Sequence, residues 1–307
     1  MKRAATSVLL LALALPCLAV AQTAAAPPKP AVAPARPVVA YGSNPAAGKT
    51  FIHDGVTLYY EVYGQGEPVL LVHGNGGSIA WLKAQIEYFR TRYRVIAMDS
   101  RDQGKSGDSP GAITYEKMTD DLAALLDHLK SPPVNVLGWS DGGIEALLLG
   151  IRHPAKVKKI AAMAANLDPG DAAIYPEMKA TIKSVMDAMP AAARATPEGR
   201  RALKAMQMLF DEPHIAPAAL EAITAPTLVL ASDHDVIRDG HTLEIYQHLP
   251  NSQLCIFPDA THMIPYDDPA RFNAAVDRFF RTPFVKKDRV KDLLTSYERL
   301  VAALPKK

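Results

Sequence analysis

Ser140 lies in the pentapeptide GWSDG (residues 138–142), which matches the pattern G-x-S-x-G. The apolar run 134–137 precedes this motif, and a helical stretch at 143–153 follows it. Between a strand and a helix, this pattern forms a sharp turn that lifts a serine hydroxyl clear of the sheet. The serine backbone is strained in such a turn. We also expect that side chains at the two motif glycines would collide across the turn. An ordinary glycine-rich turn fits the motif alone equally well. Other residues of the chain must therefore decide whether Ser140 is a nucleophile.

A second glycine-rich turn lies upstream of the serine. The buried strand 69–72 runs into the segment HGNGG at 73–77. In an acyl-transfer enzyme such a loop supplies one backbone N–H to the oxyanion, and the residue after the nucleophile supplies the other. By position these donors are Asn75 and Asp141. A dinucleotide-binding fingerprint is the competing interpretation, but Ile79 stands where its third glycine belongs.

Two later strands end near residues of the types that assist a serine nucleophile, an aspartate and a histidine. Strand 227–231 leads into an acidic turn, where Asp235 is the predicted triad acid and Asp233 is the alternative. Strand 254–257 leads into a loop that ends at His262. A histidine in this role takes the serine proton during attack, and the aspartate orients its imidazole. Capping of the next helix is the other role open to either aspartate, and it suits Asp233 better.

These motifs and their order, serine then aspartate then histidine, resemble those of the α/β-hydrolase superfamily. The resemblance covers residues 51–280 and rests on HGNGG at 73–77, DSRDQGKS at 99–106, GWSDGG at 138–143, Asp235 and His262. The serine motif is similar to that of the branch containing valacyclovir hydrolase, the biphenyl-hydrolase-like proteins. The family often has glycine where this chain has Asp102, so we expect a different turn in that loop.

Short apolar strands alternate with helical stretches along most of the chain. Strands are predicted at 56–62, an edge strand by its alternation, and at 69–72, 95–98, 134–137, 159–164, 227–231 and 254–257. Helices are predicted at 115–129, 143–153, 241–248 and 269–280. This alternation is typical of a parallel sheet that is covered on both faces. Together with the resemblance it predicts an α/β-hydrolase fold, with a mostly parallel central sheet, helices on both faces and a small helical cap.

The predicted organisation has four parts. Residues 1–21 read as a signal peptide, with a basic start, an apolar run and a small-x-small cleavage site, so we expect an exported protein, periplasmic or secreted. An uncleaved anchor is the alternative. Residues 22–49 form an Ala/Pro-rich linker, and 50–282 form the hydrolase domain with a helical cap insertion at 166–225. The final part, 283–307, is an amphipathic helix that we expect to pack on its own domain, with dimerisation as the alternative.

Composition agrees with one globular domain and excludes several classes of partner. The chain has 307 residues, 49% hydrophobic, and removal of Lys2 and Arg3 with the leader leaves 32 basic against 32 acidic residues. A balanced charge does not favour nucleic acid or an anionic membrane. The mature chain keeps one cysteine, Cys255, and lacks C-x-x-C and H-E-x-x-H spacings, so we predict no disulfide, no metal and no cofactor. We also predict no membrane span in the mature form.

The predicted function is that of a carboxylesterase-type serine hydrolase acting on a small-molecule ester. Ser140 attacks, His262 and Asp235 assist it, and the amides of Asn75 and Asp141 bind the oxyanion. The Asp141 side chain is also a candidate contact for a cation on the acyl group, which favours aminoacyl esters; helix capping is its alternative role. A C–C bond hydrolase and an amidase or iminopeptidase use the same triad. A ligand-binding protein of the same fold is the non-enzymatic alternative.

Overall fold

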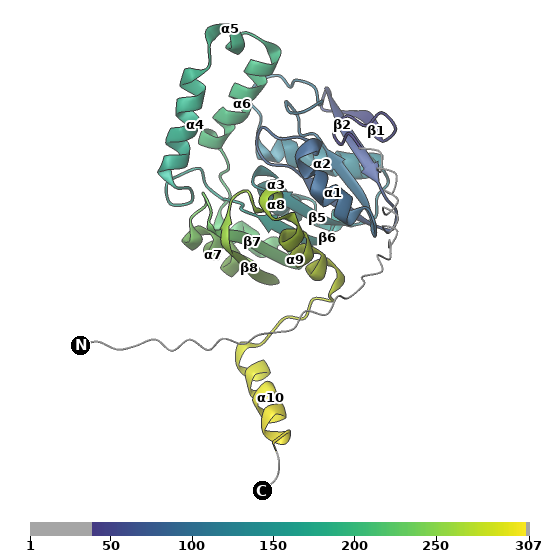
Figure 1. Ribbon diagram of the computed structural model, residues 1–307, viewed down its shortest axis with the longest axis vertical. Helices are drawn as coiled ribbons and strands as arrows, with labels where there is room; N and C mark the ends of the chain where they lie inside the picture. Colours follow the sequence, from purple (N-terminus) through teal and green to yellow (C-terminus); the bar gives the residue numbers. More distant parts are fainter. Residues whose placement is uncertain (1–38, 305–307) are drawn as a thin grey trace, which may run out of the picture. The chain divides into compact units, whose positions relative to one another are not determined.

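The computed structural model describes residues 39–304, so the predicted signal peptide and residues 22–38 of the predicted linker lie outside the described residues. Eight strands form one sheet in the order β1-β2-β4-β3-β5-β6-β7-β8 (Figure 1). The strands are β1 (Gly48–His53), β2 (Val56–Tyr63), β3 (Glu67–Val72), β4 (Tyr93–Met98), β5 (Val134–Trp139), β6 (Val157–Met163), β7 (Thr227–His234) and β8 (Ser252–Thr261). Pairing is antiparallel from β1 to β2 and from β2 to β4, and parallel across the rest of the sheet.

Helices follow most of the strands. The α-helices are α1 (Lys83–Phe89), α2 (Tyr115–His128), α3 (Asp141–Arg152), α4 (Pro176–Ala188), α5 (Ala191–Arg194), α6 (Pro197–Asp211), α7 (Asp239–His248), α8 (Ile264–Asp267), α9 (Pro269–Arg281) and α10 (Arg289–Ala302). Three short 3-10 helices are η1 (Ile79–Leu82), η2 (Pro154–Lys156) and η3 (Pro217–Ala222).

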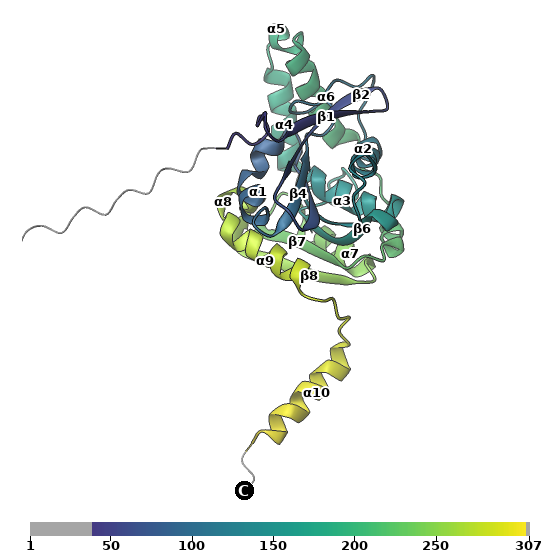
Figure 2. The ribbon, with the colours of Figure 1, turned by 90° about the vertical axis from the view of Figure 1, so that its right-hand side faces the viewer.

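Two hydrophobic layers cover the two faces of the sheet. Successive side chains of a strand point to opposite faces, and β3 shows the consequence: Leu70 lies in one apolar cluster and Leu71 in the other. Helices α2, α3 and α7 contribute to the first cluster, whereas α1 and α9 contribute to the second (Figure 2). The predicted fold class, a mostly parallel sheet with helices on both faces, is confirmed.

The amino-terminal edge of the sheet differs from the prediction. Strand β2 was expected at the edge, but β1 lies outside it and forms the edge instead. The folded part also begins before the predicted boundary at residue 50, because Tyr41 is only 5% exposed. Buried Glu61 holds this segment in place by accepting hydrogen bonds from the amides of Gly42 at 2.9 Å and Asn44 at 3.0 Å. The Ala/Pro-rich composition concealed these contacts, since they depend on one distant carboxylate.

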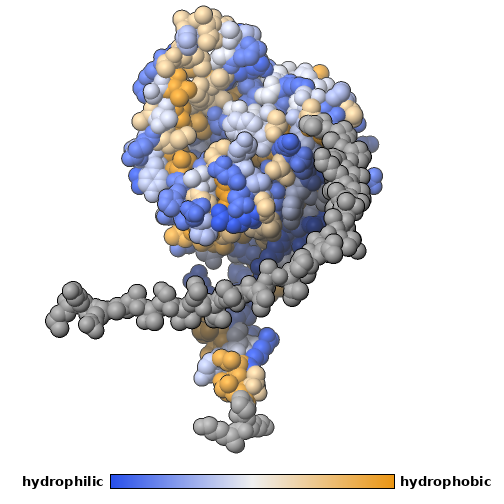
Figure 3. All heavy atoms as spheres, viewed as in Figure 1, coloured by the Kyte–Doolittle hydropathy of each residue, from blue (hydrophilic) through white to orange (hydrophobic). Residues whose placement is uncertain are grey.

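Two regions stand apart from the sheet. Helices α4, α5 and α6 lie between β6 and β7, where a cap was predicted, and form the teal group at the top of Figure 1. The carboxy-terminal helix α10 has no buried residue, so the structure does not bury its apolar face on the domain as expected. Figure 3 shows apolar side chains exposed on that helix.

Candidate active site

The strand order brings the predicted catalytic residues to one edge of the sheet. Ser140 follows β5, Asp235 follows β7 and His262 follows β8. These three strands run parallel, so their carboxyl ends meet at the same edge, which is where ligands bind in open α/β sheets.

Ser140 occupies a strained turn between β5 and α3. Its backbone has φ 58° and ψ −117°, a combination that residues other than glycine rarely adopt. A Cβ added at Gly138 would lie 1.8 Å from the carbonyl oxygen of Gly142, and one added at Gly142 would lie 2.3 Å from that of Val72. The predicted collision across the turn is therefore confirmed. The amide of Ser140 donates to the carbonyl of Met163 at 2.8 Å, which fixes the turn against β6.

His262 is paired with Asp235 and not with Asp233. The Nδ1 atom of His262 lies 2.7 Å from Oδ1 of Asp235, whose side chain is fully buried. Asp233 instead accepts hydrogen bonds from the amides of Asp259 at 2.9 Å and Ala260 at 3.1 Å, and these amides hold its pKa below the ordinary range. Of the two aspartates considered, the geometry favours Asp235 as the partner of the histidine.

The loop that carries His262 is anchored by residues that the motif analysis did not assign. The indole Nε1 of Trp139 donates to the carbonyl of His262 at 3.0 Å. The hydroxyl of Ser232 donates to the carbonyl of Thr261 at 2.7 Å. Trp139 is the variable residue before the serine, so the motif position was visible in the sequence while its hydrogen bond was not.

Asn75 and Asp141, the predicted oxyanion donors, line the same cavity as Ser140. Gly74 packs so closely that an added Cβ would lie 3.1 Å from the Cβ of Ser140. Within residues 39–304, neither amide donates to a backbone carbonyl in the turns and loops around the site. Buried His73 holds this loop: its Nδ1 contacts the carbonyl of Gly74 at 2.8 Å, and its Nε2 accepts from the amide of Ser100 at 3.1 Å. Burial lowers the pKa of His73, which favours the neutral ring that these contacts require.

The carboxylate of Asp141 is buried and bonded on both oxygens. The side-chain amide of Asn75 donates to Oδ2 at 2.9 Å, and the hydroxyl of Tyr115 donates to Oδ1 at 2.8 Å. Burial raises the pKa of Asp141 to about 6 in spite of these donors. The side chain thus ties the loop at 73–77 to α2 and α3, and its contact with a substrate cation stays a prediction.

Asp102 has a backbone conformation that glycine favours. Its φ of 61° lies in the left-handed region, which few residues other than glycine adopt easily. Its carboxylate accepts from Nζ of Lys204 at 2.5 Å, and the same ammonium donates to the carbonyl of Ser109 at 2.7 Å. Lys204 belongs to the cap helix α6, so Asp102 connects the body to the cap.

A cavity of about 260 Å³ lies over the nucleophile between the body and the cap. It is smaller than most small-molecule sites, which range over ~300–1,000 Å³. Body residues that line it are Gly74, Asn75, Trp81, Trp139, Ser140, Asp141, Asn166, Ile174, Val236, Ile237, His262 and Met263. The cap supplies Met178, Lys179, Ile182, Met206 and Leu209. Two methionines of the cap, Met178 and Met206, therefore line the cavity, whereas Met208 is buried in the core.

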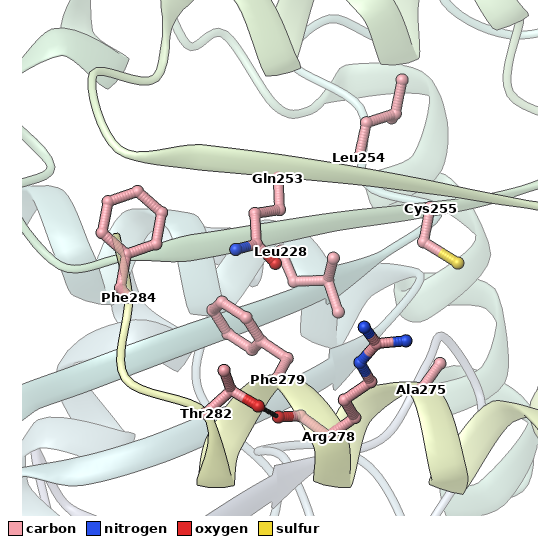
Figure 4. A pocket seen from close by; sticks show the side chains of 9 residues that line it. All are labelled: Leu228, Gln253, Leu254, Cys255, Ala275, Arg278, Phe279, Thr282 and Phe284. Carbon is pink, nitrogen blue, oxygen red and sulfur yellow. Dashed lines mark hydrogen bonds between the residues drawn. The ribbon is translucent and has the colours of Figure 1, made fainter. Parts of the chain in front are cut away.

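A second hollow, of about 290 Å³, lies along the edge strand β8 beside α9. Figure 4 shows Phe279, Phe284 and Cys255 around it, with Arg278 below. None of the predicted catalytic residues lines this hollow. It is therefore separate from the candidate active site.

The described part of the chain offers neither a cluster of metal ligands nor a helix suited to span a membrane. Residues 39–304 hold no group of three or more His, Cys, Asp or Glu side chains placed to bind a metal ion. No helix among those residues combines the length and the apolarity needed to cross a membrane.

Comparison with known proteins identifies relatives of this chain. The family described as "alpha/beta hydrolase fold" matches residues 67–202. The human protein named "Serine hydrolase BPHL" is 26% identical over 261 residues, which cover 79% of this chain and 89% of that protein. The "3-oxoadipate enol-lactonase 2" of Acinetobacter baylyi is 26% identical over 251 residues, covering 72% of this chain and 92% of that protein.

Among solved structures, a thermophilic esterase from Thermogutta terrifontis superposes with a TM-score of 0.63. It is 28% identical to this chain and covers 76% of it, with 97% of the esterase matched. The sheet order, the strained serine between β5 and α3, the His262–Asp235 pair and these relatives lead to one conclusion: the chain belongs to the α/β-hydrolase superfamily.

Proposed function

We propose that this protein is a serine hydrolase that cleaves carboxylic esters of small or medium acyl groups through an acyl-enzyme. The observation that carries the proposal is the 2.7 Å contact between His262 and Asp235, with Ser140 and His262 lining one cavity. A histidine held in this way has one nitrogen fixed by the carboxylate and the other free to serve a nucleophile.

The proposed reaction has two stages, formation of the acyl-enzyme and its hydrolysis. His262 takes the proton of Ser140 as the hydroxyl attacks the ester carbonyl, and Asp235 stabilises the imidazolium that forms. The amides of Asn75 and Asp141 receive the negative charge that develops on the carbonyl oxygen. His262 then returns the proton to the departing alcohol. Water then attacks the acyl-enzyme by the same steps, and the acid is released.

The cavity and the relatives support an ester with a modest acyl group. Apolar side chains from the body and the cap make up most of the lining, and a cavity of about 260 Å³ suits a small or medium acyl group. One relative is named an enol-lactonase and another an esterase, and both names describe cleavage of an acyl–oxygen bond.

The first test is labelling with a fluorophosphonate, which reacts with an activated serine. Protein beginning at Gln22 is compared with Ser140→Ala and His262→Ala, and folding of each is checked by circular dichroism. We expect label on the wild type alone, mapped to Ser140. A folded wild-type protein that takes up no label would remove the enzymatic proposal and favour the ligand-binding alternative.

A substrate panel then separates the classes that share this triad. Matched acyl groups are offered as p-nitrophenyl esters, anilides and vinylogous C–C ring-cleavage products. We expect ester turnover to exceed the other two by at least ~100-fold, because p-nitrophenoxide is a better leaving group than an anilide nitrogen or a carbanion. Faster turnover of the anilide or of the C–C substrate would reassign the reaction.

We also propose that the protein is exported, on the basis of the predicted leader at 1–21. Expression of the full chain in a Gram-negative host should yield a periplasmic or secreted product that begins at Gln22. Intact mass and cell fractionation measure both features. Recovery of a full-length cytoplasmic product would contradict the proposal.

A further inference from the structure

We propose that Lys179 makes the cavity selective for esters that carry a carboxylate away from the scissile bond, an inference that rests on the proposed function. Lys179 lies on the cap helix α4, where Met178 and Ile182 line the same cavity. The substrate class is therefore a half-ester of a dicarboxylic acid, or an ester whose alcohol portion is acidic.

Lys179 is the only lysine or arginine that lines this cavity in the described part of the chain. Its side chain is 27% exposed, so most of it is withdrawn from water. A charge in such a place interacts more strongly with a ligand than a charge in bulk solvent does. Because the lining offers no other lysine or arginine, this ammonium is the strongest partner available to a bound carboxylate.

The present partner of Lys179 is held loosely. The Nζ atom of Lys179 lies 3.4 Å from Oδ1 of Asp171, whose side chain is 67% exposed. An exposed ion pair with this separation contributes little to stability, because water screens it. A substrate carboxylate that enters the cavity competes with Asp171 at little cost.

A side chain of opposite charge also lines the cavity. Asp141 lies directly after Ser140, and burial raises its pKa to about 6, so its carboxyl group is largely ionised at neutral pH. A substrate carboxylate is repelled by Asp141 and attracted by Lys179. The two side chains therefore orient an anionic ester with its reactive carbonyl at Ser140 and its carboxylate at Lys179.

The experiment compares charged and neutral members of two substrate pairs. For the acyl side, the p-nitrophenyl half-ester of glutaric acid is compared with its methyl-capped diester. For the alcohol side, 4-carboxyphenyl butyrate is compared with its methyl ester. The enzymes are the wild type, Lys179→Met, Lys179→Arg and the control Lys183→Met. Lys183 lies on the same helix, is 67% exposed, pairs with Asp187 and does not line the cavity.

For at least one pair, we expect Lys179→Met to lower kcat/KM of the charged ester about ten-fold and to leave that of the neutral ester within two-fold. Lys179→Arg should retain the preference, and Lys183→Met should match the wild type. The pair that responds identifies the side of the substrate that bears the carboxylate.

Equal changes for charged and neutral esters in both pairs would overturn the role of Lys179. Loss of the preference in Lys183→Met as well would also overturn it, because the preference would then depend on the overall charge of α4 and not on the ammonium in the cavity. Failure of the proposed function looks different: wild-type protein would hydrolyse neither member of either pair and would take up no fluorophosphonate at Ser140.

Discussion

The sheet edge that carries the candidate triad and the cap above it are held in different ways. At the sheet edge, Ser140 is positioned by backbone hydrogen bonds and by glycines that leave no room for a side chain. In the cap, α4 and α5 have no buried residue, and α6 buries only Ala205 and Met208. The cap is instead attached through polar contacts such as the Lys204–Asp102 ion pair.

This difference separates the chemistry from the choice of substrate. Backbone positions in a close-packed sheet change little when surface side chains change, so the nucleophile and its partners keep one geometry. A cap attached through a few polar contacts can change its lining residues without disturbing the sheet. The contact that joins the two regions at the nucleophile is the Asn75 side chain, which donates to Asp141 and, at 2.9 Å, to the carbonyl of Ala205.

The largest expected effect is on catalysis at the sheet edge. Asp235→Asn should lower kcat by about 10³–10⁴, because the amide no longer holds His262 in the tautomer that accepts the serine proton. Asp233→Asn is the matched control, since Asp233 bonds to the amides of Asp259 and Ala260. Steady-state kinetics on a p-nitrophenyl ester measure both. A larger loss in the Asp233 variant would exchange the two assignments.

Replacement of a motif glycine should break the sheet edge itself. In Gly138→Ala the new Cβ meets the carbonyl of Gly142 at 1.8 Å, and backbone on both sides prevents relief, so we expect at least ~4 kcal/mol of destabilisation. Gly240→Ala is the control, because nothing lies within 4 Å of its added Cβ and alanine favours the helix α7. Urea unfolding compares them. A Gly138 variant as stable as the wild type would contradict the turn geometry.

The buried carboxyl group of Glu145 on α3 should make the stability of the protein depend on pH. Neither oxygen of Glu145 has a hydrogen-bond partner within residues 39–304, and burial raises its pKa well above the ordinary 4.5. The folded state keeps the proton that the unfolded state releases, so stability is lost as the pH rises above about 4.5.

Glu145→Gln should remove this pH dependence. Its stability advantage over the wild type should grow by about 1.4 kcal/mol for each pH unit between the unfolded and the folded pKa. Urea unfolding at pH 5, 6 and 7 measures the slope, with exposed Glu298→Gln on α10 as the control. Parallel slopes for wild type and Glu145→Gln would show that water reaches the Glu145 carboxyl.

The smallest expected effect is on the attachment of the cap. Lys204→Met leaves the fully buried Asp102 carboxylate without its cation and loosens α6, which carries Met206 and Leu209 over the cavity. We expect KM to rise about three- to ten-fold with kcat nearly unchanged. Adding Asp102→Gly should recover stability, because glycine suits the positive φ and no buried charge remains. A fall in kcat with unchanged KM would place Lys204 in the chemistry instead.

Much of the body could be predicted from the chain because its signals are local. The G-x-S-x-G motif between an apolar strand and a helix is typical of a strained turn, and the structure leaves no room for a side chain at its two glycines. Parallel strands that alternate with helices imply that their carboxyl ends meet, which predicted that Ser140, Asp235 and His262 share one edge. The edge strand β1 escaped prediction because its pairing with β2 and the burial of Tyr41 depend on contacts beyond the local pattern.

What the sequence determined by itself is the fold class, the candidate nucleophile and the order of its candidate partners, because each follows from residue types at short range. Only the tertiary structure decided that Asp235 and not Asp233 contacts His262, that Asp141 bonds to Asn75 and Tyr115, and that Lys179 lines the cavity. These are choices among side chains of the same type or the same helix. They depend on distances between segments that are remote in sequence, which residue patterns do not encode.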